Sequence, residues 1–523
     1  MYTLFFNGII HTLDDNNLSC NAILVQNDRI AYCGKGNEIN VPDSTVKKYD
    51  LNGLHIYPGF IDCHTHVASV ALAKERLRLD KCLSLSSALT MIKKHVTKYK
   101  AGTWILGSGW NSNLWSDGQP EKSHLDKLTS VHPVALYNKD GHTQWLNSKA
   151  LEICRFDLNT PDPSGGKLGR DSKGNLTGLV YEKACDVVYH QSEKITYDKL
   201  YNCLEKTYPE LHTLGITSVH SCESMTILSL FQEMSNRDDL KLRICFHPPE
   251  ADAQHFIEHR LVSGSGNEWL RLGGLKYFVD GSLGSQTAEM FENYNGLTHA
   301  GIEVITEDDL TEKVSYAADK GLSATIHAIG DKANSKALNA LERVNAISKK
   351  SKLRHRIEHA QIIRHKDIAR FADLSVIASM QPVHISDDVK IADKYLGERS
   401  ISAYRIRSLI KSGCKVVFGS DMPMADPDPL KGIRAAISRR YLLRENEPIW
   451  NENERIPASW ALRAYTCDAA FASYEDHIKG TLAEGKLADF IGLRYDIEQA
   501  DEALLRDMKV EITVLGGKIV YKS

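Results

Sequence analysis

The chain lacks the features that mark membrane, secreted and nucleic-acid-binding proteins. It has no run of about 18 or more apolar residues, so we expect no membrane span. Residues 1–10 carry no basic stretch and no signal-type apolar segment, so we expect no secretion signal. The net charge is only −3, from 64 basic and 67 acidic residues, and no basic block occurs, which argues against a nucleic-acid partner.

Disulfides are not expected either. The 11 cysteines are odd in number and scattered, and without a secretion signal they are typical of reduced thiols in a cytoplasmic protein. Repeats and low-complexity segments are absent. What the chain contains is 42% apolar and 25% charged residues, which is ordinary for a globular enzyme with a sizeable core. A length of 523 residues is too great for one ordinary domain but suits a large barrel with additions.

The middle of the chain alternates short apolar runs with helical patterns, such as those at 308–320, 332–344 and 365–371. Eight alternations favour a (β/α)8 barrel of the TIM type, which is an α/β fold, over an open sheet. The eight expected strands lie at 61–67, 217–220, 242–246, 275–279, 324–327, 356–359, 376–380 and 416–419.

The two ends of the chain differ from its middle. Short strand candidates separated by turns fill residues 1–56, and the same pattern returns near the C-terminus. We therefore expect residues 1–56 and 478–523 to form one small β-sandwich domain, and residues 57–477 to form the barrel. A long gap separates the first two barrel strands, so we expect residues 70–205 to be an insertion that covers the barrel mouth.

Two histidines stand at the end of the first expected strand. His64 and His66 are two residues apart, so on a strand both imidazoles point to the same side and can aim at one metal ion. Alone, such a pair is more often two surface histidines. Cys63 points to the opposite face and is best interpreted as a small buried apolar residue.

Four further ligand-type residues fall at later strand ends, where the active sites of these barrels lie. They are Lys276, His327, His359 and Asp421. Three have ordinary alternatives. His327 can be a core histidine, His359 can form a surface pair with Glu358, and Asp421 can begin a turn or cap a helix. Lys276 is harder to dismiss, because a buried lysine is costly unless it is paired or chemically altered. Together these residues predict a metal centre on one rim.

The motifs that carry these residues resemble the amidohydrolase superfamily, specifically the amidohydrolase-3 branch that includes N-substituted formamide deformylases. The resemblance runs nearly end to end. Its motifs lie at 58–67, 140–147, 276–288, 327–331, 356–361, 420–423 and 480–489. It implies a metal-dependent hydrolase on a TIM-type barrel, and its last motif marks the return of the chain into the small β domain.

The resemblance also implies a role for each ligand. The H-x-H pair and Asp421 would hold the more buried divalent metal, and His327 and His359 the second. Lys276, carboxylated by carbon dioxide, would bridge the two ions. Asp421 would also orient the attacking water and carry its proton to the leaving nitrogen. Nitrogen-rich ligation makes zinc the default metal, with manganese, iron and cobalt left open. In the alternative, an unmodified Lys276 serves a single-metal site or pairs with Asp280.

Substrate contacts are expected from the insertion and the rim. The insertion holds a cluster of tryptophans, which can either cover an apolar substrate or form the insertion's own core. They are Trp104, Trp110, Trp115 and Trp145. We assign Trp110, His142 and Asp280 to the substrate. Further candidates for the rim are His220, His384 and Glu182, of which the two histidines are explained equally well by packing.

The expected reaction is hydrolysis of a carbon–nitrogen bond other than a peptide bond by a metal-activated water. The substrate would be a small amide, N-acyl or N-formyl compound. The same site can instead open cyclic amides, deaminate a ring or hydrolyse an ester. A non-catalytic, metal-bound regulatory or binding protein also stays open, because fold alone does not fix function. A homo-oligomer formed through the β domain is compatible with each of these.

Overall fold

A computed structural model describes residues 2–14, 20–39, 46–192, 195–441 and 444–523 of the chain. The gaps at 15–19 and 40–45 fall in the expected β domain, 193–194 in the expected insertion and 442–443 in the expected barrel, so those parts of the predicted ranges lie outside the described residues. Among the described helices, none is both long and apolar enough to cross a bilayer.

Two parallel sheets form the centre of the molecule. The first contains, in spatial order, β15 (Leu270–Leu272), β14 (Arg243–His247), β13 (Ile216–Cys222) and β6 (Phe60–Thr65). The second contains β16 (Leu275–Phe278), β17 (Ala324–Ala328), β18 (Arg356–His359), β19 (Ile377–Met380) and β20 (Val416–Phe418). Most of their residues are buried, as expected for parallel strands covered on both faces. All eight predicted strands form.

Two isolated bridges link the two sheets. A parallel bridge joins Thr65 to Met422, and another joins Pro249 to Lys276. The fold is therefore of the TIM-barrel type, which confirms the predicted α/β class, but its strands form two arcs joined by single bridges rather than one continuous ladder.

Amphipathic helices cover the outside of these arcs. In α9 (Glu307–Asp319), Leu310, Val314, Ala317 and Ala318 are buried at helical spacing, and the Thr306 hydroxyl accepts the backbone N–H of Asp309 at the N-terminus. Helices α10 (Asp331–Arg343) and α12 (Ile368–Asp373) also occur where the sequence predicts them. The other helices of this layer are α1 (Val67–Ala73), α6 (Tyr197–Thr213), α7 (Met225–Asn236), α8 (Ala253–Glu258), α11 (Asn345–Ser351), α13 (Pro382–Leu396), α14 (Ile406–Lys411), α15 (Pro429–Ser438), α16 (Ala458–Ala464), α17 (Cys467–Ala472) and α18 (Glu502–Asp507).

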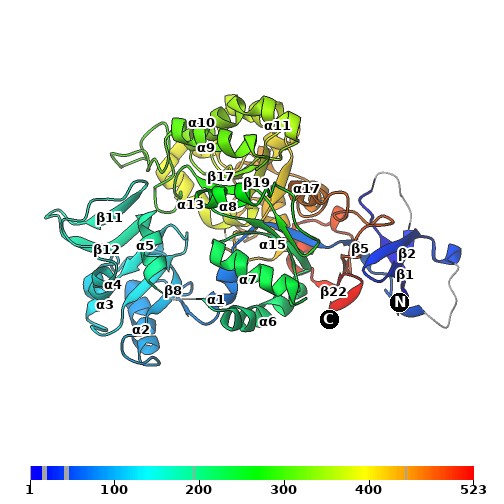
Figure 1. Cartoon of the computed structure of the whole chain (residues 1–523), viewed down its shortest axis with the longest axis horizontal. Helices are drawn as coiled ribbons and strands as arrows, with labels where there is room; N and C mark the ends of the chain where they lie inside the picture. Colours follow the sequence, from blue (N-terminus) through cyan, green and yellow to red (C-terminus); the bar gives the residue numbers. More distant parts are fainter. Residues whose placement is uncertain (1, 15–19, 40–45, 193–194, 442–443) are drawn as a thin grey trace.

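Most of the segment between β6 and β13, from β7 to α5, builds a lobe of its own, coloured light blue to blue-green in Figure 1. Its six-stranded sheet runs in the order β11 (Gly166–Arg170), β12 (Leu176–Glu182), β10 (Thr143–Leu146), β9 (Val134–Asn138), β8 (Ile105–Trp110) and β7 (Leu77–Arg78). Its helices are α2 (Leu85–Val96), α3 (Lys122–Asp126), α4 (Ser148–Ile153) and α5 (Ala184–Gln191). The lobe touches the barrel rim, where the Thr143 Oγ1 lies 3.0 Å from the Ser285 Oγ and Lys139 pairs with Asp387.

Strands from both ends of the chain share one sheet, at the far end of the molecule from the insertion (Figure 1). Its order is β23 (Lys518–Lys522), β22 (Val510–Leu515), β21 (Phe490–Leu493), β5 (His55–Pro58), β1 (Tyr2–Ile10), β2 (Cys20–Gln26) and β3 (Arg29–Gly34), with β4 (Val46–Asp50) also pairing with β1. Buried Phe5, Ile56 and Phe490 form part of its core. The second sheet of the expected sandwich, and the domain boundaries, stay predictions.

Candidate functional site

The six predicted metal ligands gather at the C-terminal ends of the barrel strands. His64, Lys276, His327 and His359 lie on β6, β16, β17 and β18. His66 directly follows β6, and Asp421 lies in the loop after β20. The ring centroids of His64 and His359 are 4.9 Å apart, and those of His327 and His359 are 4.5 Å apart. Because parallel strands end on one rim, residues distant in sequence meet there.

A carboxylate oxygen lies between the first two histidines. The Asp421 Oδ1 is 3.4 Å from the Nε2 of His64 and 3.2 Å from the Nε2 of His66. One ligand atom from each of these three residues lies within 4.8 Å of the others, which is close enough to hold one metal ion. The Asp421 backbone N–H donates to the His64 carbonyl oxygen at 2.7 Å and so ties the end of β20 to β6.

The opposite ring nitrogens are held by acceptors. The Nδ1 of His66 donates to the Cys222 carbonyl at 2.6 Å, the Nδ1 of His64 donates to the Glu358 carboxylate, and the Nδ1 of His359 donates to the Gln381 amide oxygen at 2.8 Å. Each Nε2 is thereby left with its lone pair on the side of the cluster. Such second partners orient metal-binding histidines in many metalloproteins.

The charge balance around Asp421 calls for a cation. Burial lowers the pKa of His64 to about 4, so its ring is neutral and presents a lone pair to the carboxylate. Burial also opposes protonation of His66, but the Asp421 carboxylate outweighs it and raises the pKa of His66. The positive charge next to the Asp421 carboxylate is therefore supplied either by a proton on His66 or by a metal ion. Two imidazole nitrogens and a carboxylate oxygen are a suitable donor set for zinc and similar divalent ions.

Glu358 and Arg356 support the metal-ligand residues through the ring nitrogen of His64 that faces away from Asp421. The sequence interpretation did not include them in the site. Both are buried, and the Arg356 Nη2 donates to the Glu358 Oε2 at 3.1 Å and to the Ser379 Oγ at 2.7 Å. Burial raises the pKa of Glu358, but Arg356 and then His64 hold it well below its usual range. Glu358 is thus an anion that orients His64, and the predicted alternative of a surface pair with His359 is wrong. The available clue was a charged Arg-x-Glu pair inside an apolar strand.

Lys276 is a buried amine beside the histidines. It is 4% exposed, and its Nζ lies 5.0 Å from the centre of the Phe278 ring. Among the described residues, none makes a hydrogen bond or ion pair with this Nζ, so the alternative pairing with Asp280 does not form. A buried ammonium without an anionic partner is unfavourable. A carboxylated amine, by contrast, would bring an anionic oxygen ligand to the same place.

His142 and Glu182 form a pair that links the insertion to the rim. The His142 Nδ1 donates to the Glu182 Oε2 at 2.7 Å, and the two imidazole rings of His142 and His327 are 5.0 Å apart. Burial lowers the pKa of His142, but Glu182 outweighs it and raises this pKa to about 9. The insertion therefore places a cationic ring next to the histidine cluster, which fits the predicted contact of His142 with substrate.

Two predicted substrate contacts need correction. Trp110 is 1% exposed, packs with Trp115 and Trp145 at ring distances of 6.1 and 6.2 Å, and donates its Nε1–H to the Leu136 carbonyl at 2.7 Å. It therefore belongs to the insertion's own core and does not line a substrate pocket. The cause is that an apolar lobe of this size needs a core of its own.

Asp280 is the other correction. It is fully buried and accepts the backbone N–H groups of Glu289, Ile329 and Gly330 at 2.7–3.0 Å. Burial raises its pKa to about 8. These contacts fix the loop that follows His327 on β17, so Asp280 positions a predicted ligand and does not reach toward a substrate.

The remaining rim candidates also have internal partners. The Nδ1 of His220 accepts from the Arg356 Nη1 at 2.8 Å, and the Nε2 of His384 donates to the Ser420 carbonyl at 3.0 Å. Both contacts support packing roles. Cys63 is fully buried, as its strand position predicts.

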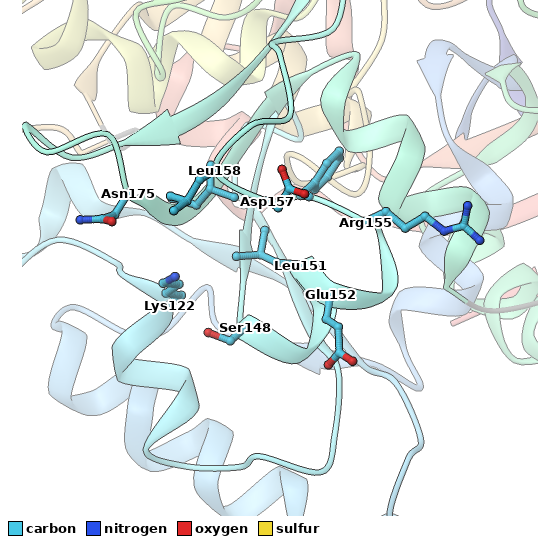
Figure 2. A pocket seen from close by; sticks show the side chains of 10 residues that line it. Lys122, Ser148, Leu151, Glu152, Arg155, Asp157, Leu158 and Asn175 are labelled. Carbon is cyan, nitrogen blue, oxygen red and sulfur yellow. The ribbon is translucent and has the colours of Figure 1, made fainter.

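A cavity of about 530 Å³ lies elsewhere, within the insertion. Figure 2 shows side chains such as Lys122, Arg155 and Asn175 around it. It shares no residue with the histidine cluster, so the candidate site rests on the geometry of the strand ends and not on this cavity.

Comparisons with known proteins identify the family of the chain. A sequence model of the amidohydrolase family matches residues 47–521. The chain is 34% identical to the protein LONG AFTER FAR-RED 3 of Arabidopsis thaliana, over 99% of this chain and 91% of that protein. It is 25% identical to the N-substituted formamide deformylase of Arthrobacter pascens, over 99% of this chain and 98% of that protein. An uncharacterised metal-dependent hydrolase from Pyrococcus horikoshii superposes with a TM-score of 0.78 at 25% identity, over 96% of this chain and 99% of that one.

Proposed function

The chain belongs to the amidohydrolase family, and from this premise we propose that it is a metal-dependent hydrolase of non-peptide carbon–nitrogen bonds, acting on amide, N-acyl or N-formyl compounds. One observation carries the proposal. Two imidazole nitrogens face the same oxygen of Asp421 at 3.2 and 3.4 Å, while acceptors hold their opposite nitrogens. The site is built to hold a cation beside a base.

The proposed metal site uses the predicted ligands. The H-x-H pair and Asp421 would hold one divalent ion, and His327, His359 and a carboxylated Lys276 would hold a second. When bound, such an ion supplies Lewis acidity, which makes water a nucleophile at neutral pH and polarises a carbonyl.

The chain's own residues would carry the protons and orient the groups. Asp421 is held anionic by the three histidines around it, although burial opposes this by raising its pKa. Its carboxylate takes the proton of the attacking water and returns it to the leaving nitrogen, so that an amine and a carboxylic acid are released. His142, held by Glu182, donates a hydrogen bond to the oxygen on which negative charge develops.

The likeness to an N-substituted formamide deformylase supports N-formyl compounds as the first substrates to test. A panel of N-formyl amines, N-acyl amines, cyclic imides and simple esters separates the reactions that this site can run. Each substrate is offered to chelator-treated protein, to the same protein reloaded with zinc or manganese, and to an Asp421→Asn variant. We expect turnover of an N-formyl or N-acyl compound only with metal and only with Asp421.

Two outcomes would overturn the proposal. Preference for the cyclic imide or the ester would move the function to ring opening or ester hydrolysis at the same site. Absence of turnover across the panel, in protein that holds its metal, would favour a metal-bound binding protein.

A further inference from the structure

A second group of metal-ligand side chains lies in the terminal sheet. His11 follows β1, His55 begins β5, and Asp496 precedes the short 3-10 helix η9 (Ile497–Gln499). One ligand atom from each lies within 4.8 Å of the other two. The sheet itself brings them together, because β5 pairs with β1 on one side and with β21 on the other, with Leu493 opposite His55.

The two histidines face each other through ring nitrogens. The Nε2 of His11 lies 3.0 Å from the Nδ1 of His55. Two imidazoles bound to one tetrahedral zinc at about 2.0–2.1 Å would have nitrogens about 3.3 Å apart, so a small outward shift admits an ion. Burial lowers the pKa of His11, which keeps its ring neutral at pH 7 and able to act as a ligand.

The neighbours of His11 fix its orientation. Its Nδ1 lies 3.5 Å from the Glu498 Oε2, and its ring stacks on buried Tyr57 with centroids 4.3 Å apart and planes 12° from parallel. A carboxylate beside one ring nitrogen favours the proton there and leaves the lone pair on the other. The Nε2 lone pair of His11 is thereby directed at His55, as in the carboxylate–histidine pairs of known zinc sites.

Asp496 offers an ionised carboxylate that is already held in place. Its Oδ1 accepts the Tyr57 hydroxyl at 2.7 Å and the Glu498 backbone N–H at 2.9 Å. Burial would raise the pKa of Asp496, but these hydrogen bonds and the two histidines hold it below its usual value. Both bonds use the Oδ1 atom, so the Oδ2 atom is the one that remains for a cation.

From this geometry we propose a second divalent-cation site of the zinc class, formed by His11, His55 and Asp496, with Glu498 beside it. Two imidazoles and a carboxylate favour zinc over magnesium or calcium, which prefer all-oxygen sites. The site shares no residue with the strand-end cluster. Because His11 and His55 come from the N-terminal strands and Asp496 from the C-terminal segment, a bound ion ties the two ends of the chain into one sheet.

Zinc binding by the full-length protein tests this site. Wild type, His55→Ala, Asp496→Asn and a control, His95→Ala in α2, are equilibrated with zinc, dialysed and measured by elemental analysis. We expect His55→Ala and Asp496→Asn to hold one equivalent less zinc per chain than wild type and the control. We also expect zinc to raise the melting temperature of wild type more than that of either variant, while turnover at the strand-end site is the same in all four proteins.

Equal zinc content and equal zinc-induced melting shifts in all four proteins would overturn the proposal and leave His11 and His55 as a hydrogen-bonded pair. We expect the Asp496→Asn variant to fold, because its amide oxygen can still accept hydrogen bonds from the Tyr57 hydroxyl and the Glu498 backbone N–H. If His55→Ala fails to fold, the comparison of Asp496→Asn with wild type decides the question alone.

Discussion

The Nε2 of His66 lies 3.2 Å from the Oδ1 of Asp421, and the opposite nitrogen of the same ring donates to the Cys222 carbonyl at 2.6 Å. His66 is therefore oriented from behind by β13 and directed forward at the carboxylate that follows β20. This arrangement supports the proposal that the strand ends hold a cation and that Asp421 acts as a base beside it.

Asp421→Asn separates the two roles of this carboxylate. The amide oxygen keeps one ligand atom, so we expect metal content close to that of wild type. The amide cannot accept a proton, so turnover should fall by about 10²–10⁴-fold, the usual contribution of a general base. Steady-state kinetics and elemental analysis measure both effects. Asp426→Asn, at an exposed ion pair with Lys431, is the control. Wild-type turnover in Asp421→Asn would remove Asp421 from the mechanism.

Glu358→Gln tests the support behind His64. The glutamine accepts the His64 Nδ1–H more weakly and loses the charge that balances Arg356. We expect metal affinity to drop by about 10–100-fold, as for other partners of metal-bound histidines. Competition with a chelator measures this affinity. Glu342→Gln, which removes the exposed partner of Arg370, should leave affinity unchanged. Equal affinities in the two variants would show that Glu358 serves packing only.

His142 and Glu182 should act as one unit. If Glu182 holds His142 as a donor, His142→Gln and Glu182→Gln each lower kcat/KM by about 10²-fold, and the double variant loses little more. Metal content should be unchanged in all three. Additive losses in the double variant would mean that the two residues work independently.

We expect Lys276 to bind metal through its carboxylated, anionic form and not to act as an ammonium. Lys276→Glu retains a carboxylate near the place of the proposed carboxylated amine, whereas Lys276→Met removes all ligand oxygens. We expect Lys276→Glu to hold more metal than Lys276→Met, and we expect bicarbonate to increase metal loading of wild type only. Full metal content in Lys276→Met would restrict the site to its histidines and Asp421.

Trp110 should matter for stability and not for substrate. It is buried against Trp115 and Trp145, so Trp110→Ala should cost about 3–5 kcal/mol of unfolding free energy. KM of the folded fraction should stay the same. Denaturant unfolding and substrate titration test the two parts separately, and a large rise in KM without a loss of stability would return Trp110 to the substrate pocket.

The sequence predicted the strands and the ligand-type residues because both follow local patterns. Buried parallel strands are short apolar runs, and a polar residue such as His327 or Asp421 stands out at their ends. The partners behind the ligands were not predictable in this way. Glu358 holds His64 and Gln381 holds His359 through side-chain directions that depend on how separate strands are arranged in space.

The errors have a similar origin. Whether Trp110 faces a substrate or its own lobe depends on how the insertion folds, and Asp280 looked chemically active until its backbone donors were known. Periodicity places a residue on a strand but does not identify what its side chain meets.

The most direct test of the metal-centre account is anomalous X-ray scattering from crystals of the full-length protein equilibrated with zinc. The account predicts an anomalous peak at the strand ends, within coordination distance of the Nε2 atoms of His64 and His66 and of the Asp421 carboxylate. Well-ordered side chains of His64, His66 and Asp421 with no anomalous peak between them, in crystals that contain zinc, would contradict the metal-centre account.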